Sequence, residues 1–181
     1  MSGYNFILQQ YCPQADTIRP CLAITGTAGR QADALLLQYH ISGDIHALHI
    51  PRQENPGSRR HGLWKDSCFE AFVGVKGSGR YWEINLSPNG DWNVYRFSGY
   101  RKEMTEESAF QALPCTLYET KHDIWLDVIV DLRAILREDH PIDLGVCCVL
   151  KHLNGDTTLW ALSHPGPGAD FHRRAGFMLA L

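Results

Sequence analysis

The stretch 81–86, YWEINL, constrains the fold more than any other part of the chain, because apolar and polar residues alternate through it without a break. Side chains of an extended strand point alternately to its two faces, so a period of two predicts a strand rather than a helix. One face carries the apolar Trp82, Ile84 and Leu86. The other carries Tyr81, Glu83 and Asn85. The apolar face predicts a core, and the polar face meets either water or a ligand.

Comparable short segments recur along the chain and are separated by residues typical of turns. The turn signals are TGTAGRQA at 25–32, SGD at 42–44 and PNGD at 88–91, and the last two have the length of hairpin loops. The expected strands cover 21–25, 34–41, 45–50, 68–75, 81–87, 92–97, 125–132, 144–150 and 176–181. One stretch, DLRAILR at 131–137, is expected to form a short helix that an aspartate caps.

Regularly spaced short strands with little helix predict an all-β fold, namely an antiparallel β-sandwich of the jelly-roll or immunoglobulin-like type. The chain has 181 residues and shows no internal repeat, low-complexity tract or linker. We therefore expect a single domain that covers residues 1–181.

Composition and charge exclude several partners. The net charge of −3 and the sequence pI of about 6.3 argue against nucleic-acid binding, which needs a basic surface. No window approaches the roughly 20 apolar residues of a membrane span, and the start of the chain, MSGYNFILQQY, shows no export signal. The cysteines are therefore expected to be free thiols in a cytoplasmic protein. They are Cys12, Cys21, Cys68, Cys115, Cys147 and Cys148.

A group of polar residues on the central strands is the first candidate site. Glu70 lies amid apolar neighbours in the expected strand 68–75, where a carboxylate is costly unless it is paired or hydrogen-bonded. If this strand pairs with the next one, Glu70, Glu83 and Asn85 share one face. Three interpretations stay open: contact with a ligand such as a sugar, an internal ion-pair network with Arg96 or Arg101, and a carboxylate pair of the glycosidase type.

A metal site is not expected. His46 and His49 lie three apart in the expected strand 45–50, so they point to opposite faces and cannot chelate one ion. The run PNGDWN offers Asn89, Asp91 and Asn93 as oxygen ligands, but it lacks the acidic density of a calcium-binding loop. A turn is the preferred interpretation of this run, with calcium as the alternative.

Three runs of the sequence resemble a known family. GLWKDSCFEAFVG at 62–74, YWEINLSPNGDWNVYRFSGYR at 81–101 and ADFHRRAGFMLAL at 169–181 resemble the DOMON-like domains that are related to family 9 carbohydrate-binding modules. The resemblance in residue types extends from Leu35 onward, and the central run at 81–101 is its most specific part. It implies a β-sandwich of jelly-roll type that binds a sugar or haem.

The resemblance also implies particular site residues. In the sugar-binding relatives, a tryptophan six residues before a strand glutamate forms one wall of the site, and Trp64 and Glu70 have this spacing. Polar residues two apart on the next strand contact the sugar, which Glu83 and Asn85 match. The relatives take a second aromatic wall from the loop before the last strand. Here that loop, within the irregular segment 163–176, offers His164, Phe171 and His172 but no tryptophan, which puts a sugar sandwiched between two tryptophans in doubt.

The favoured function is therefore a non-catalytic domain that binds a carbohydrate or a similar small polar ligand. One alternative is a haem protein, because the haem-binding branch of the family uses Met and His as axial ligands, and Met104 and several histidines are present. Another alternative is a structural domain whose Glu/Arg network holds no ligand. The ligand's identity and the oligomeric state cannot be derived from the sequence.

Overall fold

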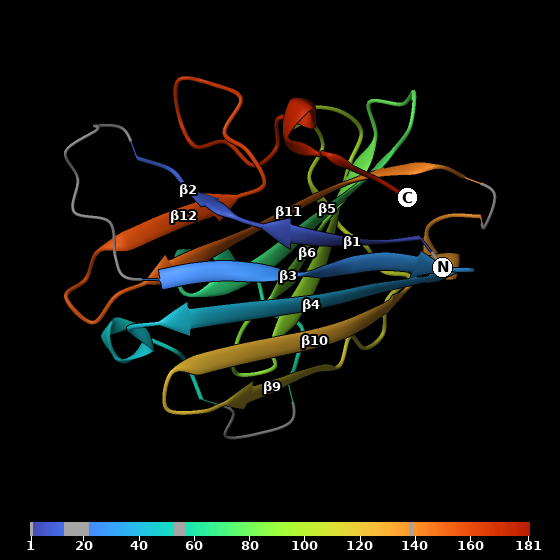
Figure 1. The fold of residues 1–181 in the computed structure, drawn as a ribbon. Helices are drawn as coiled ribbons and strands as arrows, with labels where there is room; N and C mark the ends of the chain where they lie inside the picture. Colours follow the sequence, from blue (N-terminus) through green and yellow to red (C-terminus); the bar gives the residue numbers. More distant parts are fainter. Residues whose placement is uncertain (1, 13–21, 53–56, 138–139) are drawn as a thin grey trace.

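The computed structural model describes residues 2–12, 22–52, 57–137 and 140–181 and confirms an all-β architecture. Antiparallel strands form two sheets that face each other as a sandwich (Figure 1). The strands match the alternating segments because each apolar face is buried between the sheets.

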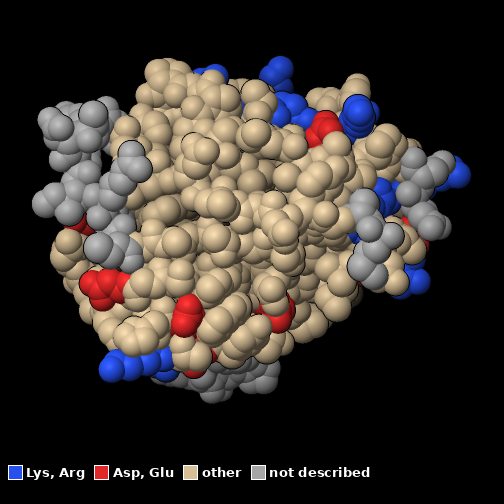
Figure 2. Space-filling model, in the orientation of Figure 1, with Lys and Arg blue, Asp and Glu red and all other residues tan. Residues whose placement is uncertain are grey.

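The first sheet has five strands in the order β1-β3-β4-β10-β9. Their bounds are β1 Ser2–Ile7, β3 Leu22–Gln31, β4 Ala34–Gly43, β10 Asp123–Asp131 and β9 Cys115–Glu119. The outer face of this sheet fills the front of Figure 2 and carries few charged side chains, with Lys and Arg at its margins. Three rings stack across it on adjacent strands: His40 on Trp125 at 4.7 Å between centroids, and Trp125 on Tyr118 at 5.2 Å.

The second sheet follows the order β2-β12-β11-β5-β6-β7-β8, and β13 pairs with β11 beyond the end of β12. The bounds are β2 Gln9–Gln10, β12 Thr157–Ala161, β11 Ile142–Lys151, β5 Cys68–Val75, β6 Tyr81–Leu86, β7 Trp92–Phe97, β8 Thr105–Glu106 and β13 Leu179–Ala180. Four 3-10 turns join the strands in the described residues: η1 Ile45–Ala47, η2 Leu63–Lys65, η3 Leu132–Ala134 and η4 Arg174–Gly176.

The main core lies between the sheets and takes one face of each central strand. Trp82, Ile84 and Leu86 of β6 are all buried in it, as their alternation predicts. The polar residues of β6 lie on the opposite face of the strand, and they are buried too. Because both faces of β6 are buried, another part of the chain must cover the outer face of the second sheet.

The segment 25–32 was expected to be a turn, and that prediction is wrong. Strand β3 runs through it to Gln31, and the chain reverses at Ala32, whose φ is +51°. Gly26 pairs with Phe6 on one side and Tyr39 on the other, and these two rings meet edge to face at 5.8 Å. The glycine therefore leaves room for two cross-strand rings and does not mark a turn.

The expected strand 45–50 is also wrong, and with it the hairpin loop at 42–44. The chain forms the 3-10 turn η1 instead, and Ile45 and Leu48 are both buried. A spacing of three between buried residues suits a helical turn rather than a strand. The argument that His46 and His49 face opposite sides of a strand therefore no longer applies.

Other local predictions hold. The PNGD loop joins β6 to β7, with Gly90 at φ +91° and its N–H donating to Ser87 O at 2.9 Å. The helix expected at 131–137 is shorter, comprising the 3-10 turn η3, and Asp131 caps it by accepting from Arg133 N.

The free cysteines among the described residues are Cys12, Cys68, Cys115, Cys147 and Cys148, and Cys21 lies outside them. No helix in the described ranges is long and apolar enough to cross a membrane.

Candidate ligand-binding site

A segment of the chain covers the outer face of the second sheet. This covering segment, residues 162–178, leaves β12 and returns over the sheet before β13; it is the orange to red trace at the top of Figure 1. Beneath it lies a second, smaller apolar cluster, made of Phe72, Tyr81, Tyr95, Phe97, Cys147, Ala161 and Phe177, with Trp64 and Phe171 packed against it. The structure thus has two apolar layers, one on each side of the second sheet.

The covering segment approaches the sheet closely at Gly74 and Gly145, where an added Cβ would meet Arg174 and Phe177. Gly145 of β11 pairs with Phe72 of β5, and a Cβ on Gly145 would lie 2.8 Å from the ring of Phe177. Arg174 holds the same region against the ends of the central strands β5 and β11, because its Nη2 donates to Val75 O at 2.9 Å and to Asp143 at 2.7 Å. The segment is therefore anchored at its C-terminal end by both ring packing and charge.

A cavity of about 370 Å³ opens between the covering segment and the sheet. This volume lies at the small end of the range for ligand pockets, about 300–1,000 Å³. Five of the seven residues expected to contact a ligand line it: Trp64, Glu70, Glu83, Phe171 and His172. Arg101, expected as an ion-pair partner, and Met104, named for the haem alternative, line it too. The remaining lining residues are Phe72, Phe97, Val149, Leu159 and Ala169.

Strand register brings the two carboxyl groups of the site together. Strand β5 pairs with β6 so that Glu70 lies opposite Asn85, and Phe72 lies opposite Glu83. Glu70 and Glu83 are therefore diagonal neighbours on one face, at a Cα separation of roughly 7–8 Å. This pairing therefore places Glu70, Glu83 and Asn85 on one face of the sheet, as expected.

Glu70 is almost completely buried, with 2% of its surface exposed. Its Oε1 has no hydrogen-bond partner, while Oε2 receives a weak hydrogen bond from the thiol of Cys147 at 3.8 Å. Burial, followed by the nearby Glu83 carboxylate, raises the pKa of Glu70 well above its ordinary value. The cavity thus contains an acid that the protein leaves without a strong partner.

Glu83 is better supported than Glu70. Asn85 donates to its Oε1 at 2.7 Å, and the thiol of Cys68 lies 3.8 Å from Asn85 Oδ1. Burial raises the pKa of Glu83, and the Asn85 hydrogen bond and the charge of Arg101 oppose this shift. Asn85 is not among the residues that line the cavity, so its position is that of a support for Glu83.

His172 faces Glu83 from the covering segment, with Nε2 3.7 Å from Glu83 Oε2. The backbone N–H of Arg101 donates to Tyr81 Oη, which leaves the tyrosine hydroxyl free to donate to His172 Nδ1 at 2.8 Å. Burial and then the charge of Arg101 lower the pKa of His172 to about 4, against an opposing effect of Asp170. The imidazole is therefore neutral at physiological pH, with Nδ1 as an acceptor and the ring proton on Nε2.

The two arginines expected to pair with the buried glutamates have other partners. Arg96 points to the opposite side of β7 and lies 3.8 Å from Glu107. Arg101 Nη2 binds Asp170 at 2.8 Å, and Asp170 also accepts from the hydroxyl of Tyr100. The expected ion-pair network with Glu70 is therefore wrong, and Arg101 acts instead as a link to the covering segment.

Trp64 forms a wall of the cavity at half burial. The turn η2 presents it after Gly62, whose φ is +80°, and its ring meets the edges of Tyr95 at 5.7 Å and His61 at 5.2 Å. Phe171, from the covering segment, lines the same cavity. The second aromatic wall expected from the loop before the last strand is thus a phenylalanine.

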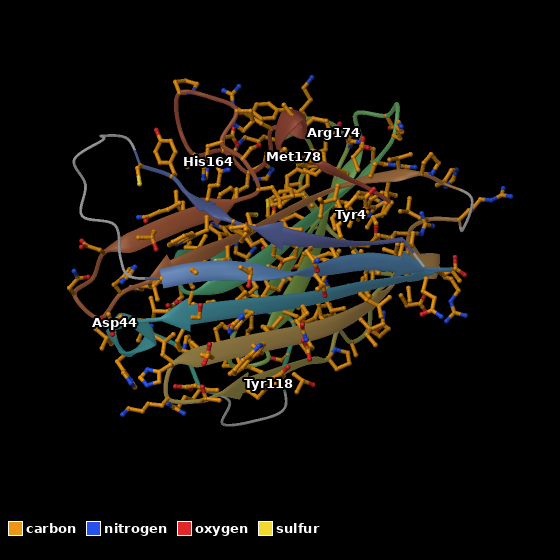
Figure 3. The ribbon with its side chains drawn as sticks, in the orientation of Figure 1. Tyr4, Asp44, Tyr118, His164, Arg174 and Met178 are labelled. Atoms are coloured by element: carbon orange, nitrogen blue, oxygen red, sulfur yellow. The ribbon has the colours of Figure 1, made fainter. Side chains whose placement is uncertain are left out.

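His164 does not line the cavity, contrary to the expectation, although its ring lies 6.4 Å from that of Phe171. It belongs to the covering segment (Figure 3). Its Nε2 donates to Gln9 O at 2.8 Å, and its ring packs on the edge of Tyr11 at 5.3 Å. Sequence reasoning missed Phe72 and Phe97 as lining residues. Both fall on the same strand faces as the polar residues of the site, so the parity that places Glu70 and Glu83 also places these rings.

The metal alternative gains no support from these contacts. Met104, which the haem alternative names, lines the cavity together with His172. Nδ1 of His172 accepts a hydrogen bond from Tyr81, and Nε2 lies 3.7 Å from Glu83 Oε2. In the PNGDWN run, Asn89 Oδ1 accepts from Asp91 N, and Asp91 accepts from Ser58 and Asn89, which is the pattern of a local turn. Among the described residues, no group of three or more His, Cys, Asp or Glu side chains could hold a metal ion.

The raised pKa of Glu70 has a consequence for stability. As pH rises above about 4.3, the unfolded chain loses the Glu70 proton while the folded protein keeps it, so the free energy of unfolding falls. Glu70→Gln removes this loss. The stability of the variant relative to wild type is expected to grow by about 1.4 kcal/mol per pH unit until the folded protein ionises.

Urea denaturation of both proteins across a series of pH values measures this difference. His172 contributes with the opposite sign, since its stabilising effect is lost as pH falls from about 6.5 toward its folded pKa of about 4. That contribution is present in both proteins and cancels in the comparison. A difference in stability that stays constant with pH would show that Glu70 is ionised in the folded protein.

Comparison with known proteins identifies the fold. No protein-family model matches the sequence. No curated protein matches it either. Among solved structures, a crystal structure described as a "putative carbohydrate-binding protein" from Bacteroides uniformis ATCC 8492 is similar over 97% of this chain and 84% of its own chain, with a TM-score of 0.66 and 14% sequence identity. The protein therefore shares the β-sandwich fold of that structure.

Proposed function

We propose that this protein is a non-catalytic binding domain that holds a carbohydrate or a similar small polar ligand in the cavity under the covering segment. The observation that carries the proposal is the unpartnered Oε1 of Glu70, buried in a cavity with aromatic walls. A buried carboxyl group without a partner is costly, and a ligand that donates a hydrogen bond removes that cost.

The composition of the cavity suits a sugar-sized ligand. Trp64 and Phe171 are aromatic walls for the C–H face of a sugar ring, while Glu70, Glu83 and His172 supply acceptors and a donor for its hydroxyl groups. The volume of about 370 Å³ favours one or two sugar rings over a polymer. The same residues carry the likeness to DOMON-like domains and family 9 carbohydrate-binding modules, and we propose that relationship for the single domain 1–181.

A structural network without ligand is the competing interpretation. It requires a basic partner for the buried carboxyl groups, and the arginines that it named bind Glu107 and Asp170 instead. The fold similarity to a protein described as carbohydrate-binding adds support of a general kind.

Calorimetric titration with monosaccharides and disaccharides at millimolar concentration tests the proposal. We expect Trp64→Ala to weaken binding about tenfold or more, because it removes the half-buried aromatic wall. Trp125→Ala is the matched control, since Trp125 lies on the outer face of the other sheet and should leave the affinity unchanged. A folded wild-type protein that binds none of these sugars contradicts the proposal.

A further inference from the structure

The two carboxyl groups of the cavity differ in how well the protein partners them. Glu70 and Glu83 both line it and are both nearly buried, with 2% and 4% of their surfaces exposed. The charge of Arg101 acts on Glu83, and Asn85 donates to it at 2.7 Å. Glu70 receives a weak thiol contact from Cys147 at 3.8 Å, and the thiol of Cys68 also favours its ionised form, but its Oε1 has no partner. Glu70 therefore lacks a cationic partner that would balance the charge of its ionised form.

The rings around Glu70 define what can complete it. Phe72 is two residues along the same face of β5, and Trp64 and Phe171 close the cavity on the side of η2 and of the covering segment. The faces of aromatic rings attract cations, the more so where water is excluded. A carboxyl group among aromatic rings is the environment that binds an organic ammonium group.

We propose that the cavity selects a ligand with a protonated amine, such as an amino sugar, and that the ammonium group binds Glu70. This inference rests on the proposed function of the same cavity. An ammonium group offers three hydrogen-bond donors and a positive charge to Glu70, whereas a neutral hydroxyl group offers one donor and no charge. The remaining polar groups, Glu83 and His172, are left for the hydroxyl groups of the sugar ring.

Proton balance follows from the state of Glu70 in the empty cavity. Burial and the Glu83 charge favour the neutral acid, so the carboxyl group holds a proton before the ligand arrives. The incoming ammonium group pairs with the carboxylate, and the Glu70 proton leaves to solvent. Binding of the amine thus releases up to one proton, and binding of a neutral sugar releases none from this group.

The titratable and charged groups that surround Glu70 come from every element packed against it. They are Cys68 on its own strand, Glu83 on β6, Cys147 and Cys148 on β11, Tyr39 on β4, and farther out Arg101, Asp170 and His172. Burial raises the pKa values of the thiols and of Tyr39, so these groups are neutral. Burial raises the pKa of both carboxyl groups, but the Asn85 hydrogen bond and the charge of Arg101 oppose the rise at Glu83, so Glu70 is the group whose proton the amine displaces.

The test compares three matched sugars in calorimetric titrations of the full chain: glucosamine, glucose and N-acetylglucosamine. We expect glucosamine to bind about tenfold or more tightly than the two neutral sugars at neutral pH. Titrations in two buffers of different ionisation enthalpy measure proton release, which is expected for glucosamine alone. Glu70→Gln should remove both the preference and the proton release, because the amide carries neither the negative charge nor the acidic proton.

Controls separate the outcomes. Glu119→Gln, an exposed carboxyl group on β9 of the other sheet, should keep the preference for the amine. If glucose binds as tightly as glucosamine, or if the preference survives in Glu70→Gln, this inference is wrong and the proposed function stands. If none of the three sugars binds, the proposed function itself fails. The comparison of glucosamine with glucose binding by the wild-type protein tests this inference even if Glu70→Gln does not fold.

Discussion

Gly26→Ala is expected to destabilise the protein by about 3 kcal/mol or more. An added Cβ at this position would lie 2.0 Å from the backbone oxygen of Gln38 and 2.4 Å from the ring of Phe6. A backbone oxygen cannot move aside as a flexible side chain can, so two neighbouring strands would have to separate. For a chain of this size the melting temperature should fall by about 6–12 °C.

Gly3→Ala is the matched control, because Gly3 lies on the adjacent strand β1 and its nearest neighbour to an added Cβ is 4.0 Å away. Thermal unfolding followed by circular dichroism measures both variants, and only Gly26→Ala should show the large loss. Equal melting temperatures for Gly26→Ala and wild type would mean that β3 and β4 tolerate a side chain at their closest approach.

Phe69→Ala and Phe72→Ala should each lower the free energy of unfolding by about 3–5 kcal/mol. The two substitutions should loosen different parts of the molecule. The two rings lie three residues apart on opposite faces of β5. Phe69 belongs to the main core and contacts Tyr39 edge to face at 5.0 Å. Phe72 lies under the covering segment, with its ring 5.6 Å from that of Phe177.

Native-state hydrogen exchange distinguishes the two losses. Phe72→Ala should raise exchange mainly in the covering segment, residues 162–178, because it removes the surface on which that segment packs. Phe69→Ala should lower protection throughout both sheets. If both variants lose protection evenly over the whole chain, the covering segment and the main core unfold as one unit.

Much of the fold was predictable from alternation alone. Period two in β4, β6 and β10 places the face of each strand that packs in the core between the sheets correctly, because packing between two sheets imposes that period. Glycine misled the prediction at 25–32, where it accommodates the rings of Phe6 and Tyr39 rather than a turn. The segment 45–50 was misread because a short apolar run looks like a strand, whereas only the spacing of three between the buried Ile45 and Leu48 indicates the 3-10 turn.

The candidate site was predictable in part, for a different reason. Strand parity and the pairing of β5 with β6 are enough to bring Glu70, Glu83 and Asn85 to one face. The partner of Arg101, Asp170, depends on the path of the covering segment, and the partner of Arg96, Glu107, lies directly after β8; no local pattern encodes either pairing. His164 was wrongly assigned to the site because the path of its loop could not be predicted. The loop reaches the cavity at Phe171 and His172 but not at His164.

The second apolar layer on the outer face of the second sheet has a consequence for how such proteins diverge. The cavity is built on that layer, outside the main core, and Tyr39 reaches across to it by one hydrogen bond to the backbone oxygen of Glu70 at 2.8 Å. Substitutions at the outward positions of β5 and β6 and in the covering segment can therefore change the shape and polarity of the cavity without repacking the sandwich. The scaffold and the cavity lining can in this way vary independently of each other.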